Sequence, residues 1–536
     1  MVNKECSCFR FELTSRPQFR KIIRKSTDNP IAVLTLVFAL SRIVFALAGI
    51  RYTINFHDLW HIAEPGLLRD HLLQTLFYLH EQPPLLNLLV GIILKLFPSD
   101  YAIVFNGIFI GVGLAISIVL YKLMTHMGVG KIVALIMVLI FMVSPASILY
   151  ENLFFYDYLL AALLIASAFL LFQYLTIGRL RYLVLFFVLL AVIVLTRSLF
   201  HLSWLLLVMV LLMILRRDQW KKIVLAGCIP CMLAVSIYVK NLVVFGNFGG
   251  STWFGMNMAR VTICQLDSAD RAAMVRNKEL SPLSLIPPFS NLSSYQRSVG
   301  TGYPTGIPTL DRPLKRDWLG CSTNFNNLAY IEISRQYGRD AQYVLTHRPG
   351  AFGKAIMLSS FYYFYPASVH FLLDSNRARI SWYERIFDLA IYGQLYDYQN
   401  AHPHQDIPDS HGVAKIFKVG IMLVIGIPLL LLYGIRSIRQ NFNAGLRGRA
   451  LSITLAFIVG TMLWIMVVGI LFECGENYRF RFMTEPYCFL LLGLFLSNRP
   501  WKKSGVMNGV ARADGTVAEF RQADMLNAPG AIDGNG

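Results

Sequence analysis

Apolar runs long enough to cross a bilayer recur along the whole chain, and they constrain its fold more than any other feature. A hydrocarbon core of roughly 30 Å is spanned by about 20 helical residues. In lipid every backbone polar group needs an internal partner, so such runs must be helices. The sequence therefore predicts an all-α, multi-pass membrane protein with about ten transmembrane helices. The predicted spans are residues 31–50, 102–122, 132–148, 156–176, 182–197, 202–216, 221–239, 415–435, 450–472 and 486–498.

The 536 residues carry a formal net charge of +18, which raises the alternative of a nucleic-acid-binding protein. The Lys and Arg residues cluster, however, in short turns between apolar runs, such as 176–182, 215–222 and 434–449. Such clustering is the positive-inside bias of membrane proteins, so no nucleic-acid partner is expected. We place these turns and the basic N-terminal arm in the cytoplasm.

This orientation leaves two apolar stretches that cannot each be one full crossing. Residues 83–98 would reach only about 24 Å as a helix, so we expect a surface or re-entrant helix on the outer side. Residues 352–374 are expected at the membrane interface, with two crossings as the alternative. All predicted spans together with these two stretches define a bundle with an α-rich segment on its outer face.

The chain divides into five predicted parts. Residues 1–30 form a cytoplasmic arm, 31–240 a transmembrane module, 241–414 an outer-face segment, 415–500 the C-terminal transmembrane helices, and 501–536 a disordered cytoplasmic tail. The first apolar run lacks a small-residue cleavage site and is interpreted as an uncleaved anchor. Cys264, Cys321 and Cys474 lie on the predicted outer side, and any two of them could form one disulfide, whose pairing the sequence leaves undetermined.

Acidic residues gather on the predicted outer face. Asp58 follows the first span and Asp157 begins the fourth, where free N–H groups at a helix N-terminus favour an anion. Two carboxylates at the mouth of a bundle can hold a divalent cation or deprotonate a hydroxyl. The alternatives are an interfacial charge that reaches water for Asp58 and simple helix capping for Asp157. Glu64 and Glu81 are candidates for a second carboxylate or for acceptor binding.

Basic residues at outer span ends break the positive-inside rule and therefore indicate a function. Arg479 and Arg481 lie in the last outer turn, and Arg197 and Lys240 end two earlier spans. Guanidinium groups match phosphate oxygens in a bidentate manner, so these four residues are predicted to bind phosphate. The alternative for the last turn is salt bridges with its own glutamates.

Two further stretches have weaker signals. His57 and His61 have a spacing that can bind zinc, but no third ligand is visible, so we interpret them as interfacial histidines bonded to neighbours. The Gly-rich stretch 245–257 lacks the lysine of a phosphate loop and is interpreted as a loop that lines a substrate groove.

These pieces, in this order, resemble the GT-C superfamily of polyprenyl-phosphate-dependent glycosyltransferases, which includes protein O-mannosyltransferases and bacterial lipid A aminoarabinose transferases. In that family an acidic residue after the first span leads through surface helices to a PPL element, similar to Asp58 and "EQPPLLNLL" here. A second outer loop carries an Asp that leads into the fourth span, similar to Asp157. A late E-x-x-R-[FY] turn followed by EP is matched by Glu476, Arg479 and "TEPY".

The resemblance covers residues 30–240 and 470–498, and residues 250–414 show no match. Many members carry adjacent acidic residues in the first loop, whereas this chain has the single Asp58, with Glu64 as a candidate for the missing carboxylate. The resemblance implies a membrane glycosyltransferase whose donor is a sugar on dolichyl or undecaprenyl phosphate. The acceptor would be a lipid, a glycan or a protein.

In the resulting hypothesis, Asp58 is the base of an inverting transfer at the outer membrane face. Asp157 shares a divalent cation (Mg²⁺ or Mn²⁺) with Asp58 or positions the acceptor, and the basic residues stabilise the departing lipid phosphate. The site would face the periplasm in a bacterial inner membrane or the lumen in an endoplasmic reticulum membrane. The main alternative is a transporter or flippase of lipid-linked sugars, although the spans lack the internal repeats and central charges typical of transporters. A membrane scaffold and a lipid phosphotransferase are further alternatives.

Overall fold

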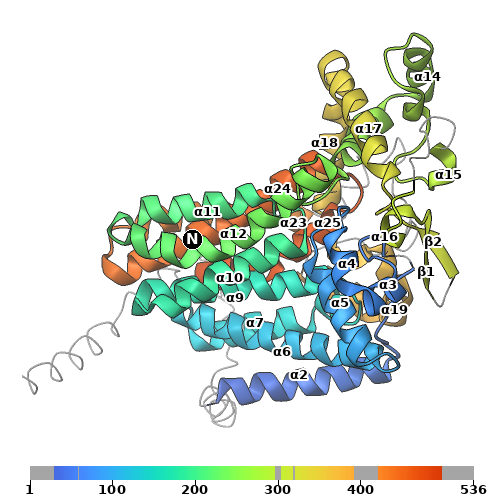
Figure 1. The fold of residues 1–536 in the computed structure, drawn as a ribbon. Coiled ribbons are helices and arrows are strands. Elements are labelled where there is room, and N and C mark those ends of the chain that lie inside the picture. The colour runs from blue at the N-terminus through green and yellow to red at the C-terminus, as the bar shows by residue number, and fades with distance from the viewer. Residues whose placement is uncertain (1–28, 58, 296–303, 318–319, 392–420, 498–536) are drawn as a thin grey trace, which may run out of the picture.

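The computed structural model describes residues 29–57, 59–295, 304–317, 320–391 and 421–497. Long helices lie side by side in a bundle, and shorter elements cover one end of it (Figure 1). We call this covered end the capped end. The cap consists of the described residues between 51 and 98, between 246 and 391, and between 477 and 482.

Each of the ten predicted spans overlaps a helix in the described residues, although several helices end earlier than predicted, as α2 does at Leu47. The bundle helices are α2 (Pro30–Leu47), α6 (Tyr101–His126), α7 (Lys131–Val143), α8 (Pro145–Glu151), α9 (Tyr156–Ile177), α10 (Leu180–Thr196), α11 (Leu202–Leu215), α12 (Trp220–Phe245), α23 (Ile421–Asn441), α24 (Gly445–Phe472) and α26 (Glu485–Ser497). Six helices in the described residues are long and apolar enough to cross a membrane, or seven if the bent pair α7–α8 is one span. The predicted all-α class is therefore confirmed, while the number of ten spans is not.

Three of the predicted spans are shorter than the others. Helices α10, α11 and α26 are apolar but contain 17, 14 and 13 residues, respectively. At a rise of 1.5 Å per residue, the shortest reaches only about 20 Å, which is less than the hydrocarbon thickness. Hydropathy, which suggested these spans, is a property of composition, whereas helix length depends on where caps and turns end each run.

The bend between α7 and α8 has a local cause. The two helices meet at 57°. Pro145 has no N–H and disfavours a helical conformation at the residue before it, so the first helix ends at Val143. Ser144 caps the second helix by accepting a hydrogen bond from the amide of Ser147 at 3.2 Å. The bend sends the chain toward the residues that precede α9.

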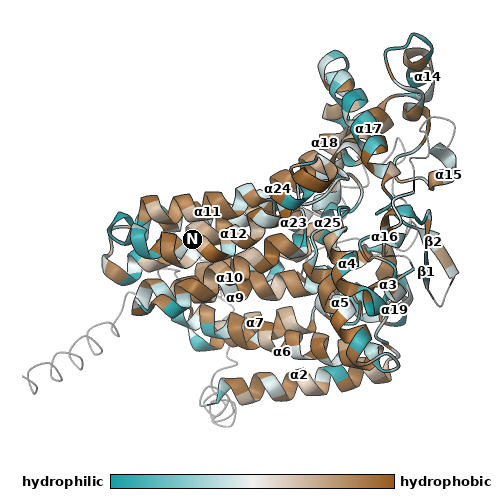
Figure 2. Ribbon diagram, viewed as in Figure 1, coloured by the Kyte–Doolittle hydropathy of each residue, from teal (hydrophilic) through white to brown (hydrophobic). Residues whose placement is uncertain are grey.

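The long helices are brown along most of their length in the hydropathy view, and teal gathers at the two ends of the bundle and on the cap (Figure 2). Helix α2 lies at the edge and leaves Leu36, Leu40 and Leu47 exposed by 60%, 52% and 83%. In water such a surface would be strongly unfavourable, since each exposed Å² of apolar area costs about 25 cal/mol. Several apolar helices with this exposure are what a multi-pass membrane protein requires.

The cap is built from short helices, 3₁₀ turns and one two-stranded sheet. Its elements are α3 (Pro65–Asp70), α4 (Leu72–Phe77), α5 (Leu85–Leu96), α13 (Phe254–Val261), α14 (Ser268–Arg276), α15 (Leu292–Tyr295), α16 (Pro308–Asp311), β1 (Leu314–Asp317), β2 (Gly320–Thr323), α17 (Ala329–His347), α18 (Pro349–Tyr363), α19 (Asp374–Arg379), α20 (Ser381–Ile391) and α25 (Asn477–Phe482). Five 3₁₀ turns are also described, at Arg217–Gln219 in the bundle and at Ile263–Gln265, Pro282–Leu285, Ala367–Val369 and Phe371–Leu373 in the cap. The antiparallel strands β1 and β2 pair Lys315 with Ser322.

The apolar stretches 83–98 and 352–374, which were not expected to be single crossings, contain short helices. Within 83–98, α5 has 12 residues and so reaches about 18 Å. Within 352–374, α18 ends at Tyr363 and two 3₁₀ turns follow, so no single straight helix fills the stretch. Their positions relative to a bilayer stay predictions. Residues 1–28 of the predicted arm (1–30), the whole predicted tail (501–536) and residues 392–420 lie outside the described residues.

Hydrogen bonds between distant segments hold the cap on the bundle. Thr53 pairs with Leu153 in a parallel β-bridge, with the Thr53 amide donating to Asn152 O and the Phe154 amide to Thr53 O, each at 2.8 Å. In α5, the amide group of Asn87 accepts from the Ala63 amide and donates to His61 O. The segment after the first span is thereby fixed beside the segment that leads into α9.

Candidate functional site

Asp157 and Arg479 come together at the capped end of the bundle. Asp157 lies in the first turn of α9 and is fully buried, and Arg479 lies in α25 with 2% of its surface exposed. The Arg479 Nε atom is 3.6 Å from Asp157 Oδ2, too far for a hydrogen bond but close enough for a direct ion pair. Neither Asp157 oxygen accepts a hydrogen bond within the described part of the chain. The carboxylate therefore caps no amide, and its nearest described ionic partner is Arg479.

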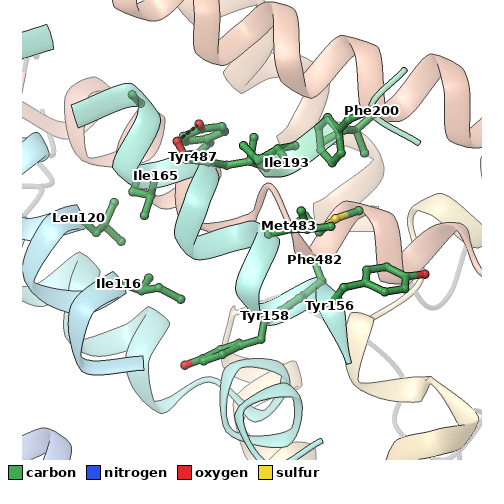
Figure 3. Packing of buried hydrophobic residues seen from close by; sticks show 14 of the residues in the cluster. Ile116, Leu120, Tyr156, Tyr158, Ile165, Ile193, Phe200, Phe482, Met483 and Tyr487 are labelled. Atoms are coloured by element: carbon green, nitrogen blue, oxygen red, sulfur yellow. Dashed lines mark hydrogen bonds between the residues drawn. The ribbon is translucent and has the colours of Figure 1, made fainter. Parts of the chain in front are cut away.

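Packing around the start of α9 explains this juxtaposition. In the close view, Tyr156 and Tyr158 of α9 lie beside Phe482 and Met483, which come from α25 and the residue after it (Figure 3). The Tyr158 and Phe482 rings stack with centroids 6.2 Å apart. Farther along α9, the Tyr487 hydroxyl donates a 2.6 Å hydrogen bond to Leu164 O. These contacts hold α25 against α9 although the two are distant in the sequence.

Glu476 is the strongest partner of Arg479. The Arg479 Nη2 atom donates to Glu476 Oε2 at 2.7 Å. Burial opposes ionisation of Glu476, but the Arg479 charge outweighs it and lowers the pKa of Glu476 to about 2. Burial also opposes the charge on Arg479, and Glu476 with the neighbouring anionic groups more than compensates, so the pKa of Arg479 is raised. Both groups are therefore charged over the whole physiological range.

Arg197 lies next to this pair and has unused hydrogen-bond donors. It follows the last residue of α10 in an extended conformation and is 8% exposed. Its guanidinium carbon is 4.5 Å from the centre of the Tyr156 ring, a cation–π contact. Its buried Nε and Nη1 atoms donate to no acceptor among the residues that the structure describes. A buried cation with unsatisfied donors is unfavourable unless an anion binds it.

A cavity of about 430 Å³ opens beside Arg197. The Gly-rich stretch predicted as a groove lining contributes Asn247–Ser251, Phe254 and Asn257 to its wall. Glu473 lies opposite, where Arg260 donates to its Oε1 atom at 2.6 Å. Burial raises the pKa of Glu473, although the Arg260 charge acts against this. The remaining wall includes the aromatic side chains of Trp464, Phe472 and Phe480, so the cavity combines one unsatisfied cation, one carboxylate and flat apolar surfaces.

A second cavity, of about 470 Å³, is almost entirely apolar and lies between α5, α6, α9 and α10. Thr196 lines this apolar cavity, and the next residue, Arg197, lines the polar one. Two consecutive residues at the end of α10 therefore line the two cavities.

His61 is surrounded by aromatic and cationic residues from distant segments, which its place in the sequence did not indicate. Its ring lies 5.3–5.6 Å from the rings of Phe155, Tyr156 and Trp253. Burial lowers the pKa of His61 well below its ordinary value, and the charges of Arg197, Arg479 and Lys315 lower it further. His61 is therefore neutral at physiological pH, and three cations from three distant segments converge on it. The sequence shows that His61 comes shortly before the helix that begins at "PGLL", but it does not show which distant side chains surround the ring.

Asp58 lies outside the described residues, and its neighbours show how the loop around it is held. Lys315 is 3% exposed, and its Nζ atom donates to Phe56 O, Leu59 O and Ile62 O at 3.1, 2.7 and 3.2 Å. A lysine from β1 thus fixes the backbone on both sides of position 58. No local pattern in residues 250–414 marked Lys315, because its role depends on a contact across more than 250 positions.

Glu81 and Glu64 lie in the same loop region but have different surroundings. Glu81 is 1% exposed, and burial raises its pKa to about 8 although the Lys315 charge acts in the opposite direction. Glu64 forms an ion pair with Arg312. Glu81 is therefore a buried carboxyl group that the Lys315 charge affects, while Glu64 is paired with Arg312 of the cap.

The other two predicted phosphate-binding residues are bonded within the protein. Arg481 donates to Glu485 Oε1 at 2.9 Å and to Tyr363 O and Tyr365 O at 3.1 and 2.9 Å. Lys240 donates to Leu79 O at 2.6 Å. Only Arg197 and Arg479 of the four therefore lie beside Asp157.

The described residues around Asp157 favour an anion over a divalent cation, while Asp58, the other predicted ligand, lies outside the described residues. No group of three His, Cys, Asp or Glu side chains that could hold a metal ion occurs within the described ranges. Arg479 lies 3.6 Å from the carboxylate, and Arg197 and Arg479 both contact the Tyr156 ring. A divalent cation at Asp157 would meet two guanidinium charges, so the site is suited to an anion.

Comparisons with protein-family models, with curated proteins and with solved structures gave no match to this chain. The fold itself defines an α-helical chain with several helices that can cross a membrane and a buried charged site at the capped end. Residues from the first loop, the start of α9, the end of α10, β1 and α25 build this site.

Proposed function

We propose that the chain transfers a sugar from a polyprenyl-phosphate donor to an acceptor at the capped end, as the sequence resemblance implies. The observation that carries the proposal is the Arg197 guanidinium, which is buried in a cavity wall with two N–H groups that have no described acceptor. A phosphate is the anion whose oxygens best match this geometry. Arg479, beside it, adds a second positive charge.

The two cavities suit the two halves of such a donor. The apolar cavity between α5, α6, α9 and α10 can take isoprenoid units, because burial of each CH₂ contributes about 0.8 kcal/mol. The polar cavity can take the phosphate and the sugar, whose ring faces stack on aromatic side chains such as Trp464 and Phe248. Thr196 and Arg197 would then lie at the junction of lipid and phosphate.

In the proposed reaction an acceptor hydroxyl attacks the anomeric carbon from the face opposite the phosphate, and the configuration inverts. Asp58 takes the hydroxyl proton. The bond between the anomeric carbon and the phosphate oxygen breaks, and its electron pair leaves with the polyprenyl phosphate. Arg197 and Arg479 stabilise the charge that develops on this oxygen. Asp157 orients Arg479 and contacts the acceptor, and no step depends on a metal.

The test is transfer from a radiolabelled polyprenyl-phosphate sugar in proteoliposomes. The wild-type protein is expected to move label to an acceptor, and Asp58→Asn is expected to abolish transfer without lowering expression or donor binding. Asp100→Asn, an exposed residue of the same outer region, is the matched control. Movement of intact donor across the bilayer without transfer would support a flippase instead. Full activity of Asp58→Asn would overturn the assignment of the base.

A further inference from the structure

Three buried polar atoms near the proposed phosphate-binding arginines have no hydrogen-bond partner among the residues that the structure describes. They are Tyr156 OH, Trp253 Nε1 and His61 Nδ1. Tyr156 and Trp253 are 1% and 4% exposed. Tyr158 shows the ordinary arrangement, because its hydroxyl points away from Tyr156 and donates to Glu151 at 2.9 Å (Figure 3). A buried polar atom without a partner costs free energy, so three of them together indicate a ligand.

The three side chains contact one another and reach Arg197. The His61 ring lies 5.5 Å from the Tyr156 ring and 5.3 Å from the Trp253 ring, measured between ring centres. On its other side, Tyr156 has the Arg197 guanidinium carbon 4.5 Å from its ring centre. The unsatisfied atoms therefore belong to one cluster of rings, which is in contact with the residue proposed to bind the departing phosphate.

The charges around this cluster favour an uncharged ligand that carries hydroxyl groups. Burial and the charges of three nearby cations lower the pKa of His61, so its ring is neutral at physiological pH. A cationic ligand would be repelled by the same three charges, and an anionic one would bind to Arg197 instead. The Trp253 N–H only donates, whereas the Tyr156 hydroxyl and the imidazole nitrogen each donate or accept. Hydroxyl groups, which do both, match all three atoms.

A series of aromatic rings leads from the cluster to the surface of the cap. Trp253 contacts Phe289 and Phe325, with ring centres 5.3 and 5.6 Å apart. Both of these rings contact Trp60, which is 44% exposed and stacks on Phe289 at 5.6 Å. Phe289 has a φ of +64°, a left-handed conformation that a bulky residue rarely adopts unless its surroundings fix it. Flat apolar faces followed by buried polar atoms match a sugar ring, which has an apolar C–H face and hydroxyl groups at its rim.

We infer that His61, Tyr156 and Trp253 hold a sugar of the acceptor, with Trp60 as the outer stacking surface, so that the acceptor is a glycan. This inference rests on the proposed glycosyl transfer and selects one of the three acceptor classes that the resemblance leaves open. An amino-acid side chain offers a single hydroxyl group, whereas a sugar ring offers several at once.

The first test identifies the acceptor from its product. Proteoliposomes with the full-length protein and a radiolabelled polyprenyl-phosphate sugar receive separate glycan, lipid and protein fractions of the native cell. We expect linkage analysis of the product to find the label in a glycosidic bond to a second sugar. Label bound directly to an amino acid, or to a lipid without a sugar, would overturn the inference and leave the glycosyl transfer standing. Absence of transfer to every fraction would contradict the proposed function and the inference with it.

A conservative variant tests the cluster itself. Tyr156→Phe removes one unsatisfied polar atom and keeps the ring that contacts Arg197. We expect the KM for the acceptor glycan to rise about tenfold, with the KM for the donor within twofold of the wild type. Because the removed hydroxyl has no described partner, the Tm should not fall. Tyr182→Phe, in the first turn of α10 and so at the opposite end of that helix, is the control.

A second variant tests the outer stacking surface. Trp60→Leu keeps an apolar side chain but removes the flat face, so the KM for the acceptor glycan should rise about fivefold with kcat within twofold of the wild type. Trp220→Leu, at the start of α12 and similarly exposed, is the control. An unchanged acceptor KM in both Tyr156→Phe and Trp60→Leu would overturn the inference and would assign the buried polar atoms to internal water.

Discussion

Two arginines that are two positions apart in one helix have separate partners. Arg479 faces Asp157 and Glu476, and Arg481 faces Glu485. Successive helical residues turn by 100°, so positions i and i+2 point to nearly opposite sides. Their closeness in the sequence predicts that both bind one phosphate, but α25 directs them to different partners. In the sequence, Glu476 before the two arginines and Glu485 after them indicated that each arginine could have its own partner.

Arg197 provides the first prediction at this scale. Replacement by Gln should lower kcat/KM for the polyprenyl-phosphate sugar about a hundredfold, because a preorganised donor to the departing phosphate is lost. Lys should restore part of the activity, since it keeps the charge without the planar fork. Arg181→Gln, exposed at the opposite end of α10, is the control and should stay active. Activity of Arg197→Gln within twofold of the wild type would exclude Arg197 from phosphate binding.

Glu81 predicts a pH dependence of stability. The folded protein keeps the Glu81 proton up to a pKa of about 8, whereas the ordinary value for the unfolded chain is 4.5. Unfolding between these values releases a proton, so the free energy of unfolding falls as the pH rises through this window and levels off above it. Glu81→Gln carries no titratable proton and should lack this contribution.

The measurement is the Tm of wild type and Glu81→Gln in detergent at intervals from pH 4 to pH 9. The Tm of Glu81→Gln minus the Tm of the wild type should be smallest near pH 4.5. This difference should rise with pH and reach a constant value above pH 8. Other groups titrate equally in both proteins and cancel in the difference. A difference that does not change with pH would contradict the raised pKa of Glu81.

At the scale of elements, the short hairpin β1–β2 has a role beyond its size. Four-residue strands contribute little stability by themselves. Their effect comes from Lys315, which joins three carbonyl groups of the loop that contains position 58. The outer segment, which resembled no known motif, thereby positions the loop that carries the proposed base.

Lys315→Met should release this loop. The substitution keeps the length of the side chain but leaves three carbonyl oxygens without their donor, at a cost on the order of 1–3 kcal/mol in the free energy of unfolding. Amide hydrogen exchange of residues 56–63 should accelerate, and transfer activity should fall with it. Arg316→Met, on the neighbouring exposed position of the same strand, should change neither. Unchanged exchange in Lys315→Met would show that other contacts hold the loop.

At the scale of the whole molecule, the helices were predictable and the site was only partly so. Long apolar runs such as 102–122 and 450–472 became α6 and α24, because hydrophobicity over twenty residues is a local property. Asp157 was found by its place at the start of a helix. Lys315, His61 and the Glu473–Arg260 pair were missed, because each depends on contacts between segments that composition and spacing do not encode. The length of α26, 13 residues, also could not be read from hydropathy.

The orientation of the bundle is a further prediction at this scale. If basic turns face the cytoplasm, the capped end faces outward. In a cysteine-free background, Arg276→Cys on α14 should react with a membrane-impermeant maleimide in intact cells, and Arg179→Cys before α10 should react only after permeabilisation. Both positions are exposed. The reverse pattern would place Asp157 and Arg479 inside the cell and would contradict the proposed site.

The Asp157–Arg479 pair also has a consequence for biosynthesis. Asp157 enters the membrane with the fourth predicted span, whereas Arg479 emerges from the ribosome only after most of the polypeptide has been made. During that interval the aspartate lacks its ion-pair partner Arg479 and has only the charge of Arg197 near it, and an incompletely neutralised carboxylate in an apolar environment is unfavourable. Synthesis of α25 supplies Arg479 and completes the ion pair. A nascent chain truncated before residue 477 would therefore present an incompletely neutralised Asp157, which the quality-control machinery of the cell can recognise.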